Sequence, residues 1–156
     1  MKKIDYKLEH ILTVTGTLAI PPEVIGPLAE GLRVNFYSTG GEITGPKIRG
    51  KVRPVGGDWL TVRKDGVGLL DVRTTYETHD DALILVTYQG MADLGVKDGY
   101  EKFLRGEMPA VVQLRISPRF CTSHPEYLWM NRLHCFGVGE FRAASNDAVY
   151  DIYAVR

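Results

Sequence analysis

The stretch VGGDWL, at residues 55–60, places a carboxylate beside a large aromatic side chain. A carboxyl group next to an indole ring loses hydration, which raises its pKa and suits it to donate or accept protons near neutral pH. The same aspartate could instead bond to backbone groups in a turn after the two glycines. Asp58 is therefore a candidate general acid or base, and Trp59 a candidate wall for a bound ring, with a turn and core packing as the alternatives.

Two arginines on strand-like segments could supply positive charge to the same site. Arg73 follows Asp71 by two positions, and Arg115 lies between a leucine and an isoleucine on another segment. Arginine keeps its charge when buried and presents a planar fork of donors. We therefore predict that Arg73 or Arg115 stabilises negative charge developing on a carbonyl oxygen while Asp58 moves a proton.

Further polar and aromatic residues are candidates for contacts with a ligand. Arg33 and Asn35 share one face of a predicted strand, and their side chains could bind oxygen atoms. Tyr127 and Asn131, together with Arg132, could form a polar cap over one end of the site, and Trp129, like Trp59, could be a wall for a bound aromatic ring. The alternatives are that Tyr127, Asn131 and Arg132 cap a short helix and that Trp129 packs in the core.

The polar faces of three predicted strands use arginine, asparagine, glutamine, threonine, serine and tyrosine more than the lysine and glutamate typical of solvent-facing positions. Such side chains could form a hydrogen-bonded network inside a barrel. In most antiparallel sheets, however, the apolar face forms the core and the polar face meets water. The sequence leaves open which face lines the interior. The opposed sets are Leu32, Val34 and Phe36 against Arg33, Asn35 and Tyr37; Leu70, Val72 and Tyr76 against Asp71, Arg73 and Thr75; and Val112, Leu114 and Ile116 against Gln113, Arg115 and Ser117.

Several familiar motifs are incomplete in this chain. His79 precedes Asp80 and Asp81, but adjacent ligands on a tight turn rarely converge on one metal ion. His134 and Cys135 are neighbours on a predicted strand and would point to opposite faces, so they do not form a nucleophile and base pair. The runs GVGEF and GGEITGPK lack the spacing and strand-to-helix context of phosphate-binding loops. We therefore expect neither a metal nor a nucleotide cofactor.

Composition narrows the classes of partner. The 156 residues contain nineteen Lys plus Arg and nineteen Asp plus Glu, so no strong positive field is expected to hold nucleic acid. The start MKKIDYKLEH is followed by no apolar signal segment, and no run approaches the roughly 20 apolar residues that cross a bilayer. We expect a cytoplasmic protein with two reduced thiols, bound neither to nucleic acid nor to a membrane.

Hydrophobic alternation with a period of two dominates the chain and predicts β-strands. The Pro- and Gly-containing segment 21–31 is predicted to be a connection, and Gly40 with Gly41 a hairpin turn. Only Asp98–Glu107 and His124–Asn131 carry hints of short helices. Strands are expected near residues 8–20, 32–38, 48–55, 60–63, 67–77, 82–89, 111–117, 133–142 and 148–155.

This pattern predicts an all-β fold for residues 1–156, a single antiparallel barrel of about eight or nine strands with one or two short helices. Closure into a barrel removes the exposed strand edges that an open sheet must protect. A barrel of this size could also form a homo-oligomer.

Three segments together resemble the bacterial and fungal family known as domain of unknown function 3237. They are GGDWL, DVRTTYETHDDALILVTYQG and YLWMNRLHCFGVGEF, and the resemblance covers most of the chain. Met130 stands where the motif has leucine, and Ala82 where it has glycine. The resemblance implies a small β-barrel and no particular reaction. Its motif residues are Asp58, Trp59, Asp71, Arg73, Asp80, Asp81, Tyr127, Trp129, Asn131 and Arg132.

The leading hypothesis is a barrel that binds a carbonyl- or enone-containing metabolite, which could be aromatic. It would act on this metabolite as a lyase, isomerase, hydratase or cyclase without a cofactor. The alternative is a carrier or sensor that binds a ligand in the same barrel without turnover. A third hypothesis is a structural subunit, whose interior should be packed solid with side chains.

Overall fold

Alternation between apolar and polar residues sets the strands of the computed structural model. In β6 (Val67–Thr78) and β8 (Val111–Cys121), every second side chain is buried and most of those between face solvent. Most of the buried residues are apolar, such as Val72 and Leu114. The apolar face of each strand therefore lines the interior, which settles the question that the sequence leaves open.

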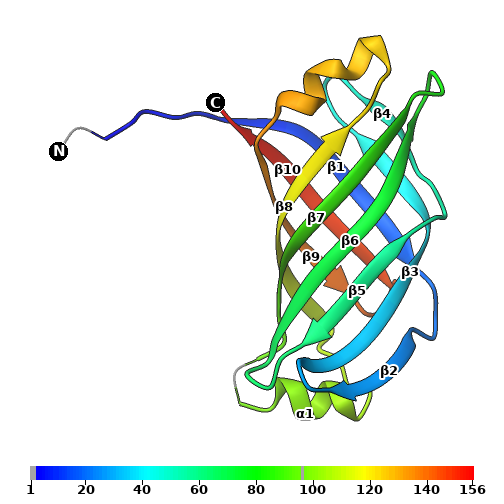
Figure 1. Cartoon of the computed structure of the whole chain (residues 1–156), viewed down its shortest axis with the longest axis vertical. Helices are drawn as coiled ribbons and strands as arrows, with labels where there is room; N and C mark the ends of the chain where they lie inside the picture. The colour runs from blue at the N-terminus through cyan, green and yellow to red at the C-terminus, as the bar shows by residue number, and fades with distance from the viewer. Residues whose placement is uncertain (1–2, 96) are drawn as a thin grey trace.

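The structure describes residues 3–95 and 97–156, whose strands form a closed antiparallel barrel of eight strand positions (Figure 1). The order around the barrel is β1, β10, β9, β8, β7, β6, then β4 together with β5, then β3, and pairing of β3 with β1 closes it. The all-β barrel predicted from the sequence is confirmed. The remaining strands are β1 (Leu8–Leu18), β2 (Glu23–Leu28), β3 (Gly31–Thr44), β4 (Arg49–Val52), β5 (Gly57–Val62), β7 (Leu83–Asp93), β9 (Cys135–Arg142) and β10 (Asp147–Val155).

Two predictions about the first third of the chain are wrong. The expected connection contains β2, which pairs with the first half of β3 from Glu23 opposite Asn35 onward. Proline and glycine hide this strand because an edge strand tolerates both. The expected hairpin at Gly40–Gly41 is absent, since β3 runs continuously through it with φ of +130° and +148°. A Cβ on Gly41 would lie 2.0 Å from a β1 carbonyl oxygen, so glycine permits this close strand contact.

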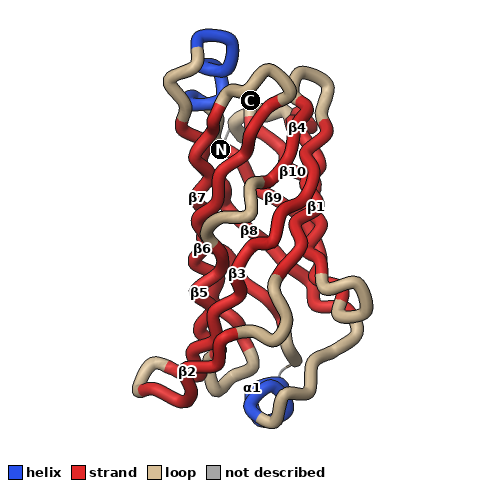
Figure 2. Tube along the Cα trace, turned by 90° about the vertical axis from the view of Figure 1, so that its right-hand side faces the viewer, coloured by secondary structure: helices blue, strands red, loops and turns tan. Residues whose placement is uncertain are grey.

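Short helices occupy the two ends of the barrel (Figure 2). The helix η1 (Pro125–Arg132) joins β8 to β9 and buries Tyr127 and Met130, while α1 (Gly99–Leu104) lies between β7 and β8 at the opposite end. Phe103 and Met108 from the α1 connection pack against the core. Both helices occur where the sequence predicts them. In the described ranges, no helix is long and apolar enough to span a membrane.

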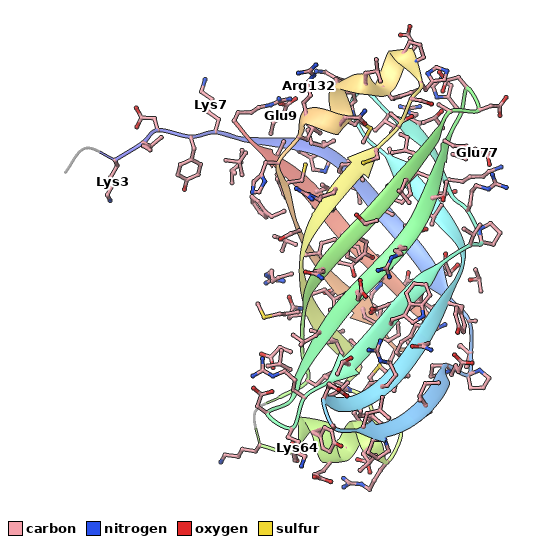
Figure 3. The ribbon with its side chains drawn as sticks, viewed as in Figure 1. Lys3, Lys7, Glu9, Lys64, Glu77 and Arg132 are labelled. Atoms are coloured by element: carbon pink, nitrogen blue, oxygen red, sulfur yellow. The ribbon has the colours of Figure 1, made fainter. Side chains whose placement is uncertain are left out.

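The outer surface carries most of the charge. Figure 3 shows Lys64 near the α1 end and Glu77 and Arg132 toward the η1 end, all on the outside of the barrel. The Glu77 carboxylate lies 3.0 Å from Lys51 Nζ and 3.6 Å from Arg53 Nε. The wall thus separates a charged exterior from an interior that is largely apolar.

Candidate functional site

The two glycines before Asp58 let β5 enter the barrel wall tightly between β3 and β6. Gly56 has a φ of +77°, and a Cβ there would lie 2.0 Å from the carbonyl oxygen of Arg73. A Cβ on Gly57 would lie 2.2 Å from the carbonyl oxygen of Phe36. Only glycine fits at these two positions. β5 begins at the second of them, and its next residue, Asp58, pairs with Val72 of β6.

Asp58 shares the inward parity of Leu60 and borders the interior cavity. Its Oδ1 accepts a hydrogen bond of 3.0 Å from the backbone N–H of Asp71. Burial raises the pKa of the Asp58 carboxyl to about 7; the Asp71 N–H opposes the rise, and the Asp71 charge adds to it. Near neutral pH, both the acid and the carboxylate of Asp58 are therefore populated.

Tyr88 on β7 and Tyr150 on β10 line the same cavity as Asp58. Their ring centroids are 5.8 Å apart and their planes meet at 67°, an edge-to-face arrangement. Burial raises the pKa of both phenols, and the negative charge of Asp58 adds to the rise. Gly139 leaves room for this arrangement, because a Cβ there would lie 2.5 Å from the Tyr150 ring.

The cavity has a volume of about 110 Å³, and most of its lining is apolar. No lysine, arginine or histidine is among the described residues that line it. The described part of the chain also holds no group of three or more His, Cys, Asp or Glu placed to bind a metal ion. The apolar lining residues include Val14, Phe36, Val52, Leu60, Leu70, Val72, Leu94, Phe103, Met108, Val112, Leu114 and Phe141, and the polar ones include Thr17, Ser38, Asp58, Thr74, Tyr76, Tyr88 and Tyr150.

This arrangement can donate or accept one proton and offer two neutral hydroxyl donors. A carboxyl with a pKa near 7 transfers protons in either direction at neutral pH. Phenols with a raised pKa stay protonated and can donate hydrogen bonds to an oxygen that gains negative charge. Little water competes for these groups, because the surrounding walls are apolar.

Arg73 and Arg115, predicted to stabilise an enolate, lie on the outer wall. The Arg73 side chain is 57% exposed, lies 3.5 Å from an Asp71 oxygen and covers the ring of Trp59 at 5.5 Å. Arg115 is exposed and donates to the carbonyl oxygen of Leu114 at 2.7 Å. Alternation along β6 and β8 directs both arginines away from the apolar face, so neither lies in the same cavity as Asp58.

Three of the predicted ligand contacts also lie on the outer face. Trp59 follows Asp58 directly in β5, and neighbouring strand residues point to opposite faces, so the two cannot share one pocket. Arg33 Nη1 donates to the carbonyl oxygen of Trp59 at 2.8 Å. Asn35 donates to a Glu23 carboxylate oxygen at 2.8 Å. These contacts join β2, β3 and β5 on the outside of the barrel.

Tyr127, Trp129 and Asn131 belong to η1 and hold it against the end of the barrel. Tyr127 donates a 2.8 Å hydrogen bond to Asp80. The Asn131 side chain accepts from the backbone N–H of Thr122 at 2.9 Å and donates to its carbonyl at 2.8 Å. Trp129 is half-buried beneath the ammonium group of Lys47. The packing alternative thus describes their observed positions better than a polar cap over the site.

Sequence reasoning missed Tyr88, Tyr150 and Thr74 as lining residues. A signal was present, because each shares its parity with buried apolar neighbours in β7, β10 or β6. A polar side chain on an otherwise apolar strand face usually needs a hydrogen-bond partner inside. Among the nine predicted site residues, the structure brings Asp58 alone to the cavity.

The family model described as Protein of unknown function (DUF3237) matches residues 6–155. A UPF0311 protein from Rhodopseudomonas palustris is 30% identical over 149 residues, which cover 94% of this chain and 95% of that protein. The crystal structure of a conserved protein of unknown function from Rhodopseudomonas palustris has a TM-score of 0.85 at 27% identity and covers 99% of this chain and 100% of its own.

A crystal structure described as an enzyme from Penicillium herquei has a TM-score of 0.70 at 22% identity, with 100% of this chain and 98% of that chain covered. At this identity the likeness concerns the fold alone. The match over residues 6–155 and the bacterial relative at 30% identity instead decide the family. The chain belongs to the DUF3237 family, also called UPF0311, of β-barrel proteins of unknown function.

Proposed function

We propose that the barrel binds a small, largely apolar metabolite with a carbonyl or enone group and moves protons on it without a cofactor. The reaction class is that of a lyase, isomerase, hydratase or cyclase. One observation carries the proposal: a carboxyl group with a pKa of about 7 borders an apolar cavity that also holds two neutral phenols.

Asp58 takes the part of general acid and base. As the carboxylate, it removes a proton from the carbon next to the carbonyl or from an attacking hydroxyl group. As the acid, it returns that proton to the carbon skeleton, so the group ends the cycle in its starting state. A pKa near the working pH suits both steps.

Tyr88 and Tyr150, rather than Arg73 or Arg115, stabilise the negative charge that develops on the carbonyl oxygen. Their hydroxyl groups donate hydrogen bonds to the carbonyl oxygen, which gains negative charge as an enolate forms. Neutral donors suit a cavity with no described cationic lining, since an ionised group there would lose its hydration.

The experiment measures hydrogen exchange in D2O on 2-tetralone, a cyclic ketone fused to a benzene ring, by mass spectrometry across pH 5 to 9. We expect the wild-type protein to accelerate exchange with a rate that changes near pH 7. Asp58→Asn should lower the rate by about 100-fold or more, while ketone binding persists. Asp151→Asn is the matched control, because this aspartate lies exposed on β10 beside Tyr150 and bonds to Thr13.

Unchanged exchange in Asp58→Asn would remove Asp58 from the chemistry. Binding of the ketone by the wild type without exchange, repeated over a panel of aryl ketones and enones, would favour the carrier or sensor alternative. Loss of exchange in Asp151→Asn would show that the assay reports on folding rather than on the site.

A further inference from the structure

Thr74 has a buried hydroxyl group without a hydrogen-bond partner. The residue is 8% exposed on the inward face of β6, and its Oγ1 has no hydrogen-bond partner among the described residues. Thr78, four residues further along the same face of β6, contrasts with it. Its hydroxyl accepts from the backbone N–H of Ala82 at 2.9 Å and also bonds to Asp80. A buried hydroxyl group without a partner lowers the stability of the fold, so the unpaired hydroxyl of Thr74 needs a physical explanation.

The cavity reaches this hydroxyl group. Thr74 and Asp58 line the same space, and so does Ser38. Asp58 pairs with Val72, and Thr74 follows two residues later on β6. The Cα atoms of Asp58 and Thr74 should therefore be about 8 Å apart, because Thr74 lies on the neighbouring strand, two residues beyond the partner of Asp58. Asp58 and Thr74 are thus two separate polar positions of the interior, and Val72 lies between them along the wall.

The barrel wall next to Thr74 is irregular rather than a regular strand. β4 ends at Val52 and β5 begins at Gly57, so the intervening residues interrupt the strand that neighbours β6 here. Gly56 follows this break, and a Cβ there would lie 3.4 Å from the Thr74 Cα. Ser38 on β3 also lines the cavity and donates its hydroxyl to the Arg53 carbonyl at 3.3 Å, so the Ser38 hydroxyl oxygen can still accept a hydrogen bond.

We propose that Thr74 is a specificity-determining residue, which hydrogen-bonds a second polar group of the ligand while the first lies at Asp58 and the tyrosines. The ligand class is a neutral and largely apolar ring system with two oxygen substituents at opposite ends, about 8 Å apart. This inference rests on the proposed use of the barrel interior for ligand binding. It adds the requirement for a second oxygen, which the proton transfer at Asp58 does not need.

Discrimination follows from the apolar surroundings. A ligand that lacks the second oxygen leaves the Thr74 hydroxyl buried and unpaired, whereas one that carries it forms a hydrogen bond sheltered from water. A net gain of about 1.4 kcal/mol corresponds to a tenfold tighter dissociation constant. The effect should therefore appear as a preference between two otherwise matched ligands.

The test compares 2-naphthol with 2,6-dihydroxynaphthalene, which carries a second hydroxyl at the far end of the same ring system. Fluorescence titration measures both dissociation constants for the wild type, Thr74→Val and Thr74→Ser. We expect the wild type to bind the dihydroxy compound about tenfold more tightly. Thr74→Val keeps the side-chain shape and should abolish this preference, while Thr74→Ser keeps the hydroxyl and should preserve it.

The outcomes separate this inference from the proposed function. An equal preference in the wild type and Thr74→Val overturns the role of Thr74, and ketone exchange that still depends on Asp58 would leave the proposed function standing. Failure of the wild type to bind either naphthol overturns the ligand class. Thermal unfolding of both variants checks the fold, and a preference retained only in Thr74→Ser supports the inference even if Thr74→Val is less stable.

Discussion

Two carboxylates of this barrel, Asp58 and Asp147, are both withdrawn from water but have opposite surroundings. Asp147, at the β9–β10 turn, is 7% exposed and accepts 2.9 Å and 2.6 Å hydrogen bonds from Arg142 Nε and Ser145 Oγ. The Arg142 hydrogen bond is the main cause that lowers its pKa. Asp58 accepts one hydrogen bond, from the backbone N–H of Asp71, and burial is the main cause of its raised pKa.

The difference between these aspartates separates a structural role from a reactive one. A carboxylate with a full set of donors is stable as an anion and holds its turn together. A carboxyl that lacks such donors gains or loses a proton easily near neutral pH, because neither form is strongly favoured. The partners of each residue, rather than its type or depth, decide which role it can take.

The largest effect that we expect concerns Asp58, whose contribution to the free energy of unfolding should change with pH in the direction opposite to that of Asp147. Between pH 4 and 7, folded Asp58 stays protonated while the unfolded chain ionises, so rising pH favours unfolding. This linkage lowers the free energy of unfolding by roughly 2 to 4 kcal/mol across that range. Asp58→Asn should remove this loss, so the variant should gain stability relative to the wild type from pH 5 to pH 8.

Urea unfolding at pH 5, 6, 7 and 8 measures this difference. The control is Asp151→Asn, which replaces an exposed aspartate on the same barrel. A stability difference between Asp58→Asn and the wild type that stays constant over this range would mean that Asp58 titrates normally. The contrast with Asp147 would then disappear.

Asp147→Asn should have a smaller effect with the opposite dependence on pH. Its carboxylate stabilises the fold above the pKa of the unfolded chain, and this contribution is lost as pH falls through the lowered folded pKa. The Arg142 side chain is 42% exposed, which limits the cost of losing its partner to about 1 to 3 kcal/mol at pH 7. Thermal unfolding at pH 7 and pH 3 should show that the cost shrinks in acid, and an equal cost at both would contradict the assignment.

The sequence allowed the fold to be predicted better than the site. Alternation identifies most strands directly, and the absence of strong helical patterns favours closure of one sheet into a barrel. β2 escapes this reasoning because Gly26 and Pro27 are typical of a loop. The sequence pattern ends β3 at a Gly-Gly pair that in fact lies within the strand. Glycine and proline mark bends in this barrel as well as turns, and alternation alone does not distinguish the two.

The site depends on contacts that alternation along one strand cannot reveal. Asp58 is prominent because a carboxylate follows two glycines in a strand-rich chain. The arginines attract attention as charged partners, yet their parity assigns them to the outer wall. Tyr88 and Tyr150 are more than sixty residues apart, and they meet only because barrel closure brings β7 and β10 to face each other across the cavity.

The smallest expected effects come from Arg73 and Arg115, and they test the separation between the outer wall and the interior. Arg73 contributes an exposed ion pair and a cation–π contact with Trp59, so Arg73→Gln should cost no more than about 1 kcal/mol. Arg115→Gln should change stability by less than about 0.5 kcal/mol, because the side chain is exposed and its hydrogen bond goes to the backbone carbonyl oxygen of Leu114 rather than to a carboxylate. Ketone exchange should stay within about twofold of the wild type in both variants, since neither residue reaches the cavity. A large loss of exchange in either variant, with normal urea unfolding, would return the arginines to the reaction and require the ligand to contact the outer wall.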